Sequence, residues 1–407
     1  MKLLVQEFLE NHSFDDLIRE HGVYASFSKS GHKFSLNYDQ IEAKENDPLA
    51  QECRGLVLAC ENGVSLSPQS LTLPGNKTTY NHLSPGKTHV LAYPMKRFFN
   101  HGQGSAADID WSDPDLTVLE KLDGTLCIVY WDKFTNIWCV ATRSVSEADL
   151  LMDNGLFTFR TLFEKAVEET SKQSFQYLTD HLDKETTYCF ELTTPYNRIV
   201  VNYPNSGVTL LAARKLSNLR EVNPNDVAIT GIPVVQAHTY NTIDELVTWV
   251  SSLDPSQHEG VVVKDSQHNR IKIKNAAYVA ASKLRDTLAT SPRNCLELIL
   301  LGKEDDAASF LPQEILNNLL SIKDKYAIWI KHQEELAQTI IKEAGSIASD
   351  KKTFALTVQK YKPDISAAMF SIYDGKANSI REFIYNNRKN GTWSNSFLDK
   401  ILFSVST

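Results

Sequence analysis

The hydrophobic pattern of this 407-residue chain changes once, close to Ala276. Before that point, short apolar runs rich in Val, Ile, Tyr and Thr alternate with Gly, Pro, Asn and Asp, which is typical of strands and turns. After it, apolar residues recur at helical spacing, most clearly from Ile315 to Ile340. The sequence therefore predicts an α+β domain over 1–284 and an all-helical domain over 285–407, each of ordinary domain size.

The apolar runs of the first part predict ten strands. They cover residues 56–60, 90–93, 116–119, 126–131, 137–142, 188–192, 199–203, 208–213, 260–264 and 270–274. Helices are expected over 15–21, 147–170 and 243–253, and in the second part also around 354–361 and 380–385. Residues 61–85 hold three prolines among many Ser, Thr and Asn, so we expect a long surface loop or insertion there.

Composition excludes several classes of protein. The net charge of −8 argues against a protein that coats nucleic acid, although a local basic patch can still bind it. No apolar run approaches the ~20 residues that cross a bilayer, and we expect no signal peptide at the start of the chain. The six cysteines form no CxxC pair, so we expect free thiols in a cytoplasmic protein without a membrane partner.

The segment 120–126 carries the most informative chemistry. Lys121 is followed by Asp123 and Gly124, between two strand-like apolar runs. Lys-x-Asp-Gly by itself is a weak signal, since it arises by chance in roughly one chain in ten of this size. The alternative is a β-hairpin with Asp-Gly at its tip and a solvated lysine beside it.

Further charged residues interrupt the predicted strands in a fixed order. Glu191 lies inside an apolar run, Glu259 opens another, and Arg54 precedes a glycine and a strand. Lys272 and Lys274 lie on one face of a strand, because strand side chains alternate. Each has an ordinary alternative, such as an edge charge, an ion-pair partner or the wet face of a half-buried strand. These ordinary roles do not readily explain why all of these charged residues occur together in this order.

This order of motifs resembles the covalent nucleotidyltransferases, and within them the phage RNA ligase 1 family. The resemblance covers roughly residues 34–280. It rests on Lys121-x-Asp123-Gly124, Glu52-Cys53-Arg54-Gly55, Pro94-Met95-Lys96-Arg97-Phe98-Phe99-Asn100, Phe190-Glu191 with Asn197-Arg198-Ile199-Val200, Glu259-Gly260, and Lys272-Ile273-Lys274 with Tyr278-Val279. It implies an adenylyltransferase domain of antiparallel sheets with flanking helices, with AMP bound in the groove between the sheets.

The resemblance also implies a reaction. Lys121 would attack the α-phosphate of ATP, displace pyrophosphate and carry AMP, which then passes to an RNA 5′-phosphate before an RNA 3′-hydroxyl attacks and releases it. Neighbouring cations favour the neutral amine that the attack needs. Lys272 and Lys274 would hold the phosphates, and Arg54, Arg97, Glu191 and Glu259 would contact the nucleotide. The cofactor would be Mg²⁺, with Mn²⁺ as an alternative.

Metal ligands are a separate expectation. Glu259 and Asp305 are the candidates, the latter within the acidic run 304–306. A solvated helix start, where acidic residues are favoured, is the alternative for Asp305. The histidines show no metal-binding spacing.

The expected partners are single-stranded RNA or tRNA with 3′-hydroxyl and 5′-phosphate ends, and a separate polynucleotide kinase–phosphatase that prepares those ends. We expect a monomer that acts in the cytoplasm, which for a phage or virus is that of the host. The helical domain would supply RNA specificity through shape. The alternatives are a DNA ligase or a capping guanylyltransferase, or a nucleotide- or RNA-binding protein without activity.

Overall fold

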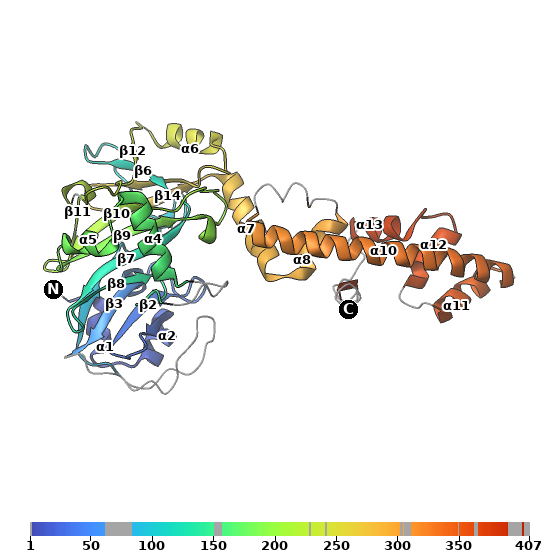
Figure 1. The fold of residues 1–407 in the computed structure, drawn as a ribbon, viewed down its shortest axis with the longest axis horizontal. Helices are drawn as coiled ribbons and strands as arrows, with labels where there is room; N and C mark the ends of the chain where they lie inside the picture. The colour runs from blue at the N-terminus through green and yellow to red at the C-terminus, as the bar shows by residue number, and fades with distance from the viewer. Residues whose placement is uncertain are drawn as a thin grey trace. The chain divides into compact units, whose positions relative to one another are not determined.

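In the computed structural model, the described residues are 2–61, 84–149, 157–227, 229–240, 242–301, 304, 311–348, 350–361, 365–389 and 401–402. The chain divides into two compact units, Met1–Tyr278 and Val279–Thr407, and Figure 1 colours them from blue to red. Each unit has a hydrophobic core of its own. The functional domains 1–284 and 285–407 stay a prediction.

Three sheets form the first unit. The first has the strand order β1-β2-β3-β4, with β1 (Val23–Phe27), β2 (Lys33–Tyr38), β3 (Arg54–Cys60) and β4 (Thr88–Ala92). The second has the order β11-β10-β9-β7-β8, with β11 (Arg220–Val222), β10 (Gly207–Lys215), β9 (Thr186–Thr193), β7 (Thr125–Asp132) and β8 (Ile137–Thr142). The third has the order β12-β6-β13-β14-β5, with β12 (Ala237–His238), β6 (Thr117–Lys121), β13 (Gly260–Lys264), β14 (Arg270–Lys274) and β5 (Phe99–Asn100).

The first two sheets pack face to face, and helices cover their other faces. Val57 of β3 and Leu91 of β4 share a buried cluster with Ile128 of β7. The outer faces pack on helices: α1 (Leu4–Leu9), α2 (Phe14–His21) and α3 (Pro48–Glu52) on the first sheet, α4 (Phe159–Ser171) and α5 (Phe175–Asp180) on the second, and α6 (Ile243–Ser252) on the third. Because central strands are buried on both faces, they form continuous apolar runs in the sequence.

The mixed α+β fold with antiparallel sheets and flanking helices confirms the predicted fold class. Every strand pair that is described is antiparallel except β14 with β5, which run parallel. Nine of the ten predicted strands are present, and the helix predicted over 15–21 is α2. Strands β1, β2, β5, β11 and β12 were not predicted, although Phe34, Leu36 and Tyr38 of β2 alternate with polar residues as strand residues do.

One predicted element is absent, and another begins later than predicted. Residues 199–203 form no strand, because the backbone N–H groups of Val200 and Val201 donate to the carboxylate of Asp123 instead of to a neighbouring strand. The helix predicted over 147–170 begins only at Phe159, where the Thr158 side chain caps it. Glu147 is not helical and pairs with Lys33 across 2.9 Å.

The Lys-x-Asp-Gly segment links two different sheets. Lys121 ends β6, which pairs with β12 and β13, whereas β7 begins at Thr125 and pairs with β8 and β9. The hairpin alternative is therefore wrong. The segment instead carries the chain from the third sheet to the second, so that its side chains lie at the junction of both.

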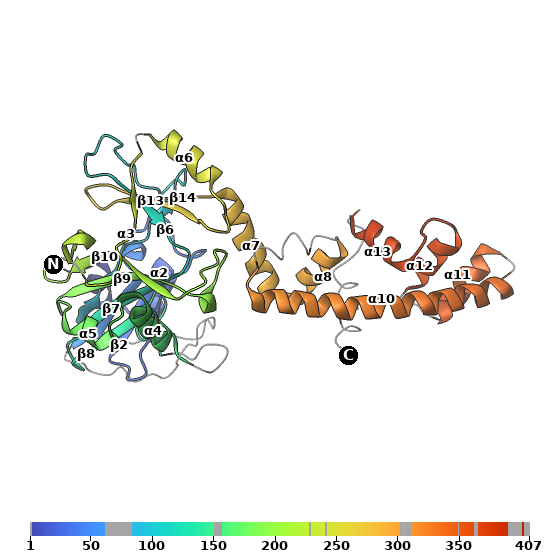
Figure 2. The ribbon, with the colours of Figure 1, turned by 45° about the horizontal axis from the view of Figure 1, so that its top comes forward.

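The second unit is helical where it is described. It contains most of α7 (Ala276–Thr290), then α8 (Pro292–Leu300), α10 (Gln313–Ile347), α11 (Lys351–Tyr361), α12 (Ser366–Tyr373) and α13 (Ile380–Lys389). Figure 2 shows α8, α11, α12 and α13 along α10. The predicted stripe on α10 is the face that packs on them, with Leu319, Tyr326 and Ile330 buried.

Some expectations fall outside the described residues or concern the whole chain. Most of the predicted insertion, residues 62–83, lies outside them. All six cysteines are free and buried, as expected. Over the described residues, no helix has the length and apolar character to cross a membrane.

Candidate active site

Lys121 and Lys274 share one carboxylate. The Lys121 Nζ lies 2.8 Å from one oxygen of Glu259, and the Lys274 Nζ lies 2.7 Å from the other. Glu259 is 4% exposed, whereas the two lysines are partly open to solvent. The carboxylate therefore sits between two cations, and a negatively charged ligand can approach the lysines from the open side.

Strand register explains why these residues meet. Gly260 of β13 is the direct partner of Lys121 on one side and of Lys274 on the other. Partners across an antiparallel ladder point to the same face, so the two lysines flank a position without a side chain. A Cβ at Gly260 would lie 2.2 Å from the carbonyl oxygen of Ile273, and its φ of +142° favours glycine. Glycine is thus required at the centre of the cluster.

Asp123 has a structural role. It is 2% exposed, and its carboxylate accepts hydrogen bonds from the N–H groups of Val200 and Val201, at 2.9 and 2.8 Å, and from the Tyr278 hydroxyl. Its own N–H donates to the Tyr203 hydroxyl across 3.2 Å. These bonds fix the segment that follows Lys121, and they explain why an acidic residue stands two positions after the lysine.

Glu191 of β9 reaches the same place from the second sheet. One of its carboxylate oxygens accepts from the Gly124 N–H across 3.1 Å. A Cβ at Gly124 would lie 2.3 Å from the Leu192 carbonyl oxygen, so this approach also needs a glycine. Burial, opposed by Lys121 and supported by Glu259, raises the pKa of Glu191 to about 7. Near neutral pH this carboxyl group can therefore be either protonated or ionised.

Lys272 and Arg54 lie near the ring of Phe98. The Lys272 Nζ is 5.1 Å and the Arg54 Cζ 5.3 Å from the ring centroid. Burial, together with the charges of Lys274 and Lys121, lowers the pKa of Lys272 to about 8. Among the described residues the buried Arg54 Nη1 has no hydrogen-bond partner. A buried donor without a partner is costly, so an acceptor from a ligand would stabilise it.

A pocket is lined by Lys121, Glu191, Arg54 and Phe98 together with other residues. It lies where the second and third sheets meet, and its lining takes in strand residues, loop residues and two of the predicted cations. The lining residues are Arg54, Met95, Phe98, Leu119, Glu120, Lys121, Leu122, Glu191, Leu211, Val235, Val262 and Arg270. An apolar part with a few charged groups is the usual construction of a small-molecule site.

The predicted site residues are not all in this pocket. Arg54, Lys121 and Glu191 line it. Glu259, Lys272 and Lys274 are not among its lining residues, although Glu259 pairs with Lys121 and Lys274. Arg97 lines a neighbouring cavity, where its guanidinium lies 4.2 Å from the centroid of the Tyr38 ring. Asp305 lies outside the described residues.

Sequence reasoning gave no role to Phe98, Tyr203 and Tyr278, although all three contact the cluster. Their signal was weak, since aromatic residues are common in strands and helix starts. Only the position of Phe98, next to Arg97 in a charged stretch, set it apart. For metals, the described residues contain no group of three or more His, Cys, Asp or Glu side chains that could hold an ion.

Two joined sheets have a lysine at their junction, flanked by carboxylates and further cations, as expected from the resemblance to the nucleotidyltransferases. A family model described as RNA ligase, of the phage RNA ligase 1 type, matches residues 52–278, and the chain belongs to this family. The match covers the part of the first unit that contains the Lys121 cluster.

Curated relatives come from viruses and a phage. A "Putative bifunctional polynucleotide kinase/RNA ligase" of Autographa californica nuclear polyhedrosis virus is 26% identical over 289 residues, or 68% of this chain and 37% of that protein. An "RNA ligase" of Rhodothermus phage RM378 is 25% identical over 337 residues, or 67% and 75%. The chain thus spans only about a third of the length of the first relative and three quarters of the second.

Among solved structures, an archaeal ATP-dependent RNA ligase is similar with a TM-score of 0.42 and 15% identity, covering 78% of each chain. A Naegleria gruberi RNA ligase mutant with ATP and Mn has a TM-score of 0.32 and 14% identity over 41% of this chain and 51% of that one. Both TM-scores lie below 0.5, so these likenesses define neither the fold nor the site of this chain.

Proposed function

We propose that this protein joins RNA ends in an ATP-dependent reaction in which Lys121 carries AMP. The observation that supports this most is the position of the Lys121 Nζ. It lies at the end of a strand, beside a carboxylate that also holds Lys274, and it lines a pocket with an unpartnered guanidinium donor. A nucleophilic amine surrounded by phosphate-binding cations fits attack on a nucleoside triphosphate.

In the first step a bond forms between the Lys121 nitrogen and the α-phosphorus of ATP, and the bond from that phosphorus to the bridging oxygen breaks. Pyrophosphate leaves with the electron pair. The ion pair with Glu259 must open, and the lysine must lose its protons to the carboxylate or to solvent. Lys272 and Lys274 stabilise the charge on the phosphate oxygens. Arg54 supplies a buried donor to the nucleotide, and Glu191 and Arg97 are also proposed to contact it.

A divalent cation fits the donor set only in part. Glu259 offers hard carboxylate oxygens, which Mg²⁺ and Mn²⁺ prefer, and in nucleotide sites such ions take most other ligands from phosphate and water. Glu259 would hold the ion, which would neutralise phosphate charge when bound. Asp305 stays a candidate ligand that the described residues do not include.

AMP then passes from Lys121 to the 5′-phosphate of an RNA strand, and an RNA 3′-hydroxyl attacks that phosphate and releases AMP. We propose single-stranded RNA or a broken tRNA as substrate, and a monomeric enzyme in the cytoplasm of a host cell. Ends that carry other groups would need a kinase–phosphatase first, and one relative is named as a kinase and ligase in one chain. The domain assignment 1–284 and 285–407 gives the first part the nucleotide chemistry and the second the choice of RNA.

The mass of the intact protein after incubation with ATP and Mg²⁺ tests the proposal. We expect the gain of one AMP per chain, stable to base and labile to acid, because a phosphoramidate has these properties. Lys121→Ala should remove the gain completely, while GTP should not replace ATP. Labelling of the Lys121→Ala protein, or labelling by GTP alone, would contradict the proposed function.

A further inference from the structure

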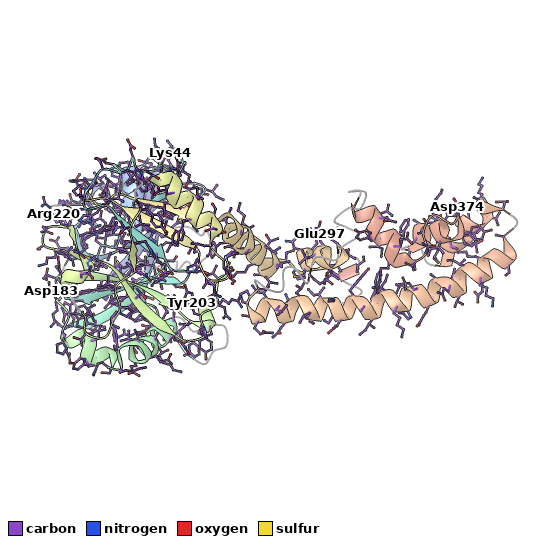
Figure 3. All side chains as sticks on the ribbon, turned by 90° about the horizontal axis from the view of Figure 1, so that it is seen from above. Lys44, Asp183, Tyr203, Arg220, Glu297 and Asp374 are labelled. Carbon is purple, nitrogen blue, oxygen red and sulfur yellow. The ribbon has the colours of Figure 1, made fainter. Side chains whose placement is uncertain are left out.

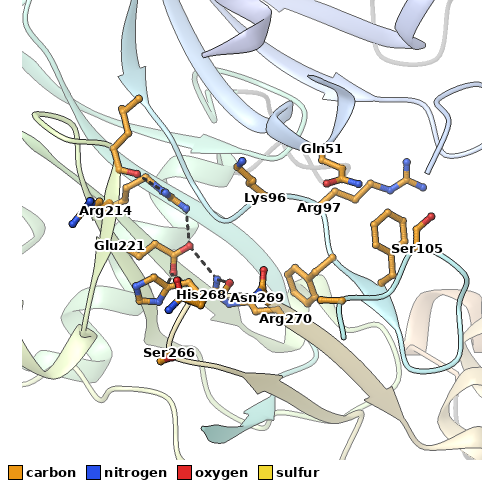
Figure 4. Close-up of a pocket in the computed structure, with 16 residues that line it drawn as sticks. Gln51, Lys96, Arg97, Ser105, Arg214, Glu221, Ser266, His268, Asn269 and Arg270 are labelled. Atoms are coloured by element: carbon orange, nitrogen blue, oxygen red, sulfur yellow. Dashed lines mark hydrogen bonds and ion pairs between the residues drawn. The ribbon is translucent and has the colours of Figure 1, made fainter. Parts of the chain in front are cut away.

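A second and larger cavity adjoins the Lys121 pocket and shares Phe98 and Arg270 with it. Its volume is about 840 Å³. Figure 4 shows Lys96 and Arg97 on one side of this cavity and Arg214, Glu221 and Arg270 on another. Its charged lining residues, among those described, are Lys96, Arg97, Arg214, Arg220, Arg270 and Glu221. Five cations face one carboxylate, so the cavity is strongly positive.

The one carboxylate is already bound. Glu221 is 5% exposed, and its oxygens accept from Arg214 at 2.6 Å and from Arg270 at 3.0 and 2.5 Å. Burial alone would raise the pKa of Glu221, but the two guanidinium groups hold it below its ordinary value. Glu221 therefore fixes two arginines in place, and the charges of the remaining cations are not neutralised by it.

Two arginine nitrogen atoms in this lining have no hydrogen-bond partner. Among the described residues these are the buried Arg97 Nη1 and Arg214 Nε. The Arg214 side chain is only 10% exposed, so water has little access to it. The Arg97 Cζ lies 4.2 and 4.9 Å from the ring centroids of Tyr38 and Phe99. The rings cover the faces of the guanidinium group, so its N–H groups can be reached only along its edge. Buried donors of this kind are stabilised by an anionic acceptor.

We infer that this cavity binds a phosphate group of the RNA strand that receives AMP, and the inference rests on the proposed function. Ligation needs a second phosphate-bearing ligand close to Lys121, while Lys272 and Lys274 are engaged with ATP. Arg270, at the other end of β14, lies on the same strand face as these two lysines, since residues two apart share a face.

Neighbouring same-face residues of a strand are about 6.6 Å apart, so β14 carries a row of three cations that leads from the cavity to Lys121. Rows of cations in a groove are how proteins follow a single-stranded backbone without reading its sequence. An RNA strand held at Lys96, at Arg220 and at the unpartnered Arg214 Nε would thus extend along this row toward the site of AMP transfer.

Two exposed cations allow a clean test. Lys96 and Arg220 line this cavity but not the Lys121 pocket, and Figure 3 shows Arg220 at the surface of the first unit. The variant Lys96→Ala/Arg220→Ala removes two charges without opening the core. Lys133→Ala/Lys165→Ala makes the same change in net charge with two exposed lysines that line neither space, and serves as the control.

The full-length proteins are compared by fluorescence anisotropy with a labelled single-stranded oligoribonucleotide, bearing a 5′-phosphate or a 5′-hydroxyl, in the absence of ATP. We expect the cavity variant to bind the 5′-phosphorylated strand at least about 10-fold more weakly and with a smaller dependence on salt. The control should bind within about two-fold of the unaltered protein. Loss with the 5′-phosphate strand alone would identify the terminal phosphate as the bound group, and loss with both strands would identify a backbone phosphate.

The rate of AMP labelling, measured on the same proteins, separates this inference from the proposed function. It should be the same in all of them. Unchanged RNA affinity in the cavity variant would overturn the inference. Slower labelling with a higher ATP requirement and normal RNA binding would also overturn it, because the cavity would then hold the polyphosphate of ATP. An unaltered protein that takes up no AMP but binds RNA through this cavity would overturn only the proposed function.

Discussion

The Nζ atom of Lys121 lies 2.8 Å from a carboxylate oxygen of Glu259. The lysine that we propose as nucleophile is thus held in an ion pair when no nucleotide is bound. The other oxygen of Glu259 holds Lys274, so one buried carboxylate keeps two cations at a fixed separation across Gly260. Binding of a nucleotide must exchange at least one of these ion pairs for contacts with phosphate.

Loss of either lysine on β14 should slow the first step. Under our proposal, Lys272→Ala and Lys274→Ala each remove a charge that would stabilise the phosphate oxygens in the transition state, so AMP labelling should fall by roughly 10²-fold or more. The measurement is the rate of labelling from radioactive ATP. Lys133→Ala removes an exposed charge elsewhere and should leave the rate unchanged. Near-normal labelling by Lys274→Ala would exclude this residue from the site.

The Glu191 carboxyl group should make stability depend on pH. Burial raises its pKa to about 7 in the folded protein, above the ordinary value of 4.5. The folded state then binds a proton that the unfolded state has lost, so this group's contribution to stability is greatest below pH 4.5 and is lost as the pH rises through 7. The loss should be on the order of 1–3 kcal/mol.

Urea unfolding of the unaltered protein and of Glu191→Gln, at a series of pH values, measures this effect. The glutamine cannot ionise, so the free energy of unfolding of the variant relative to the unaltered protein should rise between pH 5 and 7 and be constant above about pH 8. A difference that does not change with pH would show that Glu191 titrates normally.

The carboxylate of Asp123 should matter for stability as well as for labelling. Asp123→Asn keeps one oxygen for the N–H groups of Val200 and Val201 but puts an NH₂ group toward Tyr278, whose hydroxyl must then accept instead of donate. The substitution also removes the negative charge that strengthens all three hydrogen bonds. We expect the free energy of unfolding to fall by on the order of 1–3 kcal/mol, and AMP labelling to slow as Lys121 loses its position.

Tyr278→Phe is the matched control for Asp123→Asn, since it removes one of the same hydrogen bonds and leaves the charge of Asp123 in place. Its cost should be about 1 kcal/mol. Urea unfolding curves give the stability of both variants, and AMP-labelling rates show whether Lys121 keeps its position in each of them. Equal, small effects in the two proteins would mean that Asp123 does not anchor the segment after Lys121.

A chain that ends at Ser291 should retain AMP labelling. The first unit, Met1–Tyr278, contains the whole Lys121 cluster and has a core separate from that of the helices. Under our proposal this chain should lose the preference for a nicked anticodon stem-loop over a generic single strand, because shape contacts would come from the second unit. The measurement is the rate at which the full-length and the shortened protein seal each of the two RNAs, together with the melting curves of both proteins. A well-folded shortened chain with unchanged preference would show that the helices do not read RNA.

The local spacing of apolar residues predicted most of the strands and helices. Strands such as Ile137–Thr142, Gly260–Lys264 and Arg270–Lys274 were predicted with the bounds they have, because the first two are short apolar runs and the third alternates charged and apolar residues. The helical spacing from Ile315 onward predicted α10 equally well. The failures were segments whose backbone hydrogen bonds go to distant partners, such as 199–203, where Asp123 takes the N–H groups.

The sequence by itself determined the class of fold, the elements and the presence of Lys121, Glu259 and the β14 lysines in their order, because periodicity and motif spacing are local properties of the chain. Only the tertiary structure decided that Lys-x-Asp-Gly joins two sheets rather than forming a hairpin. It also brought together the cations of the second cavity, which come from four separate segments. Register between strands and ion pairs across more than a hundred residues depend on how the sheets pack, and no local pattern records that.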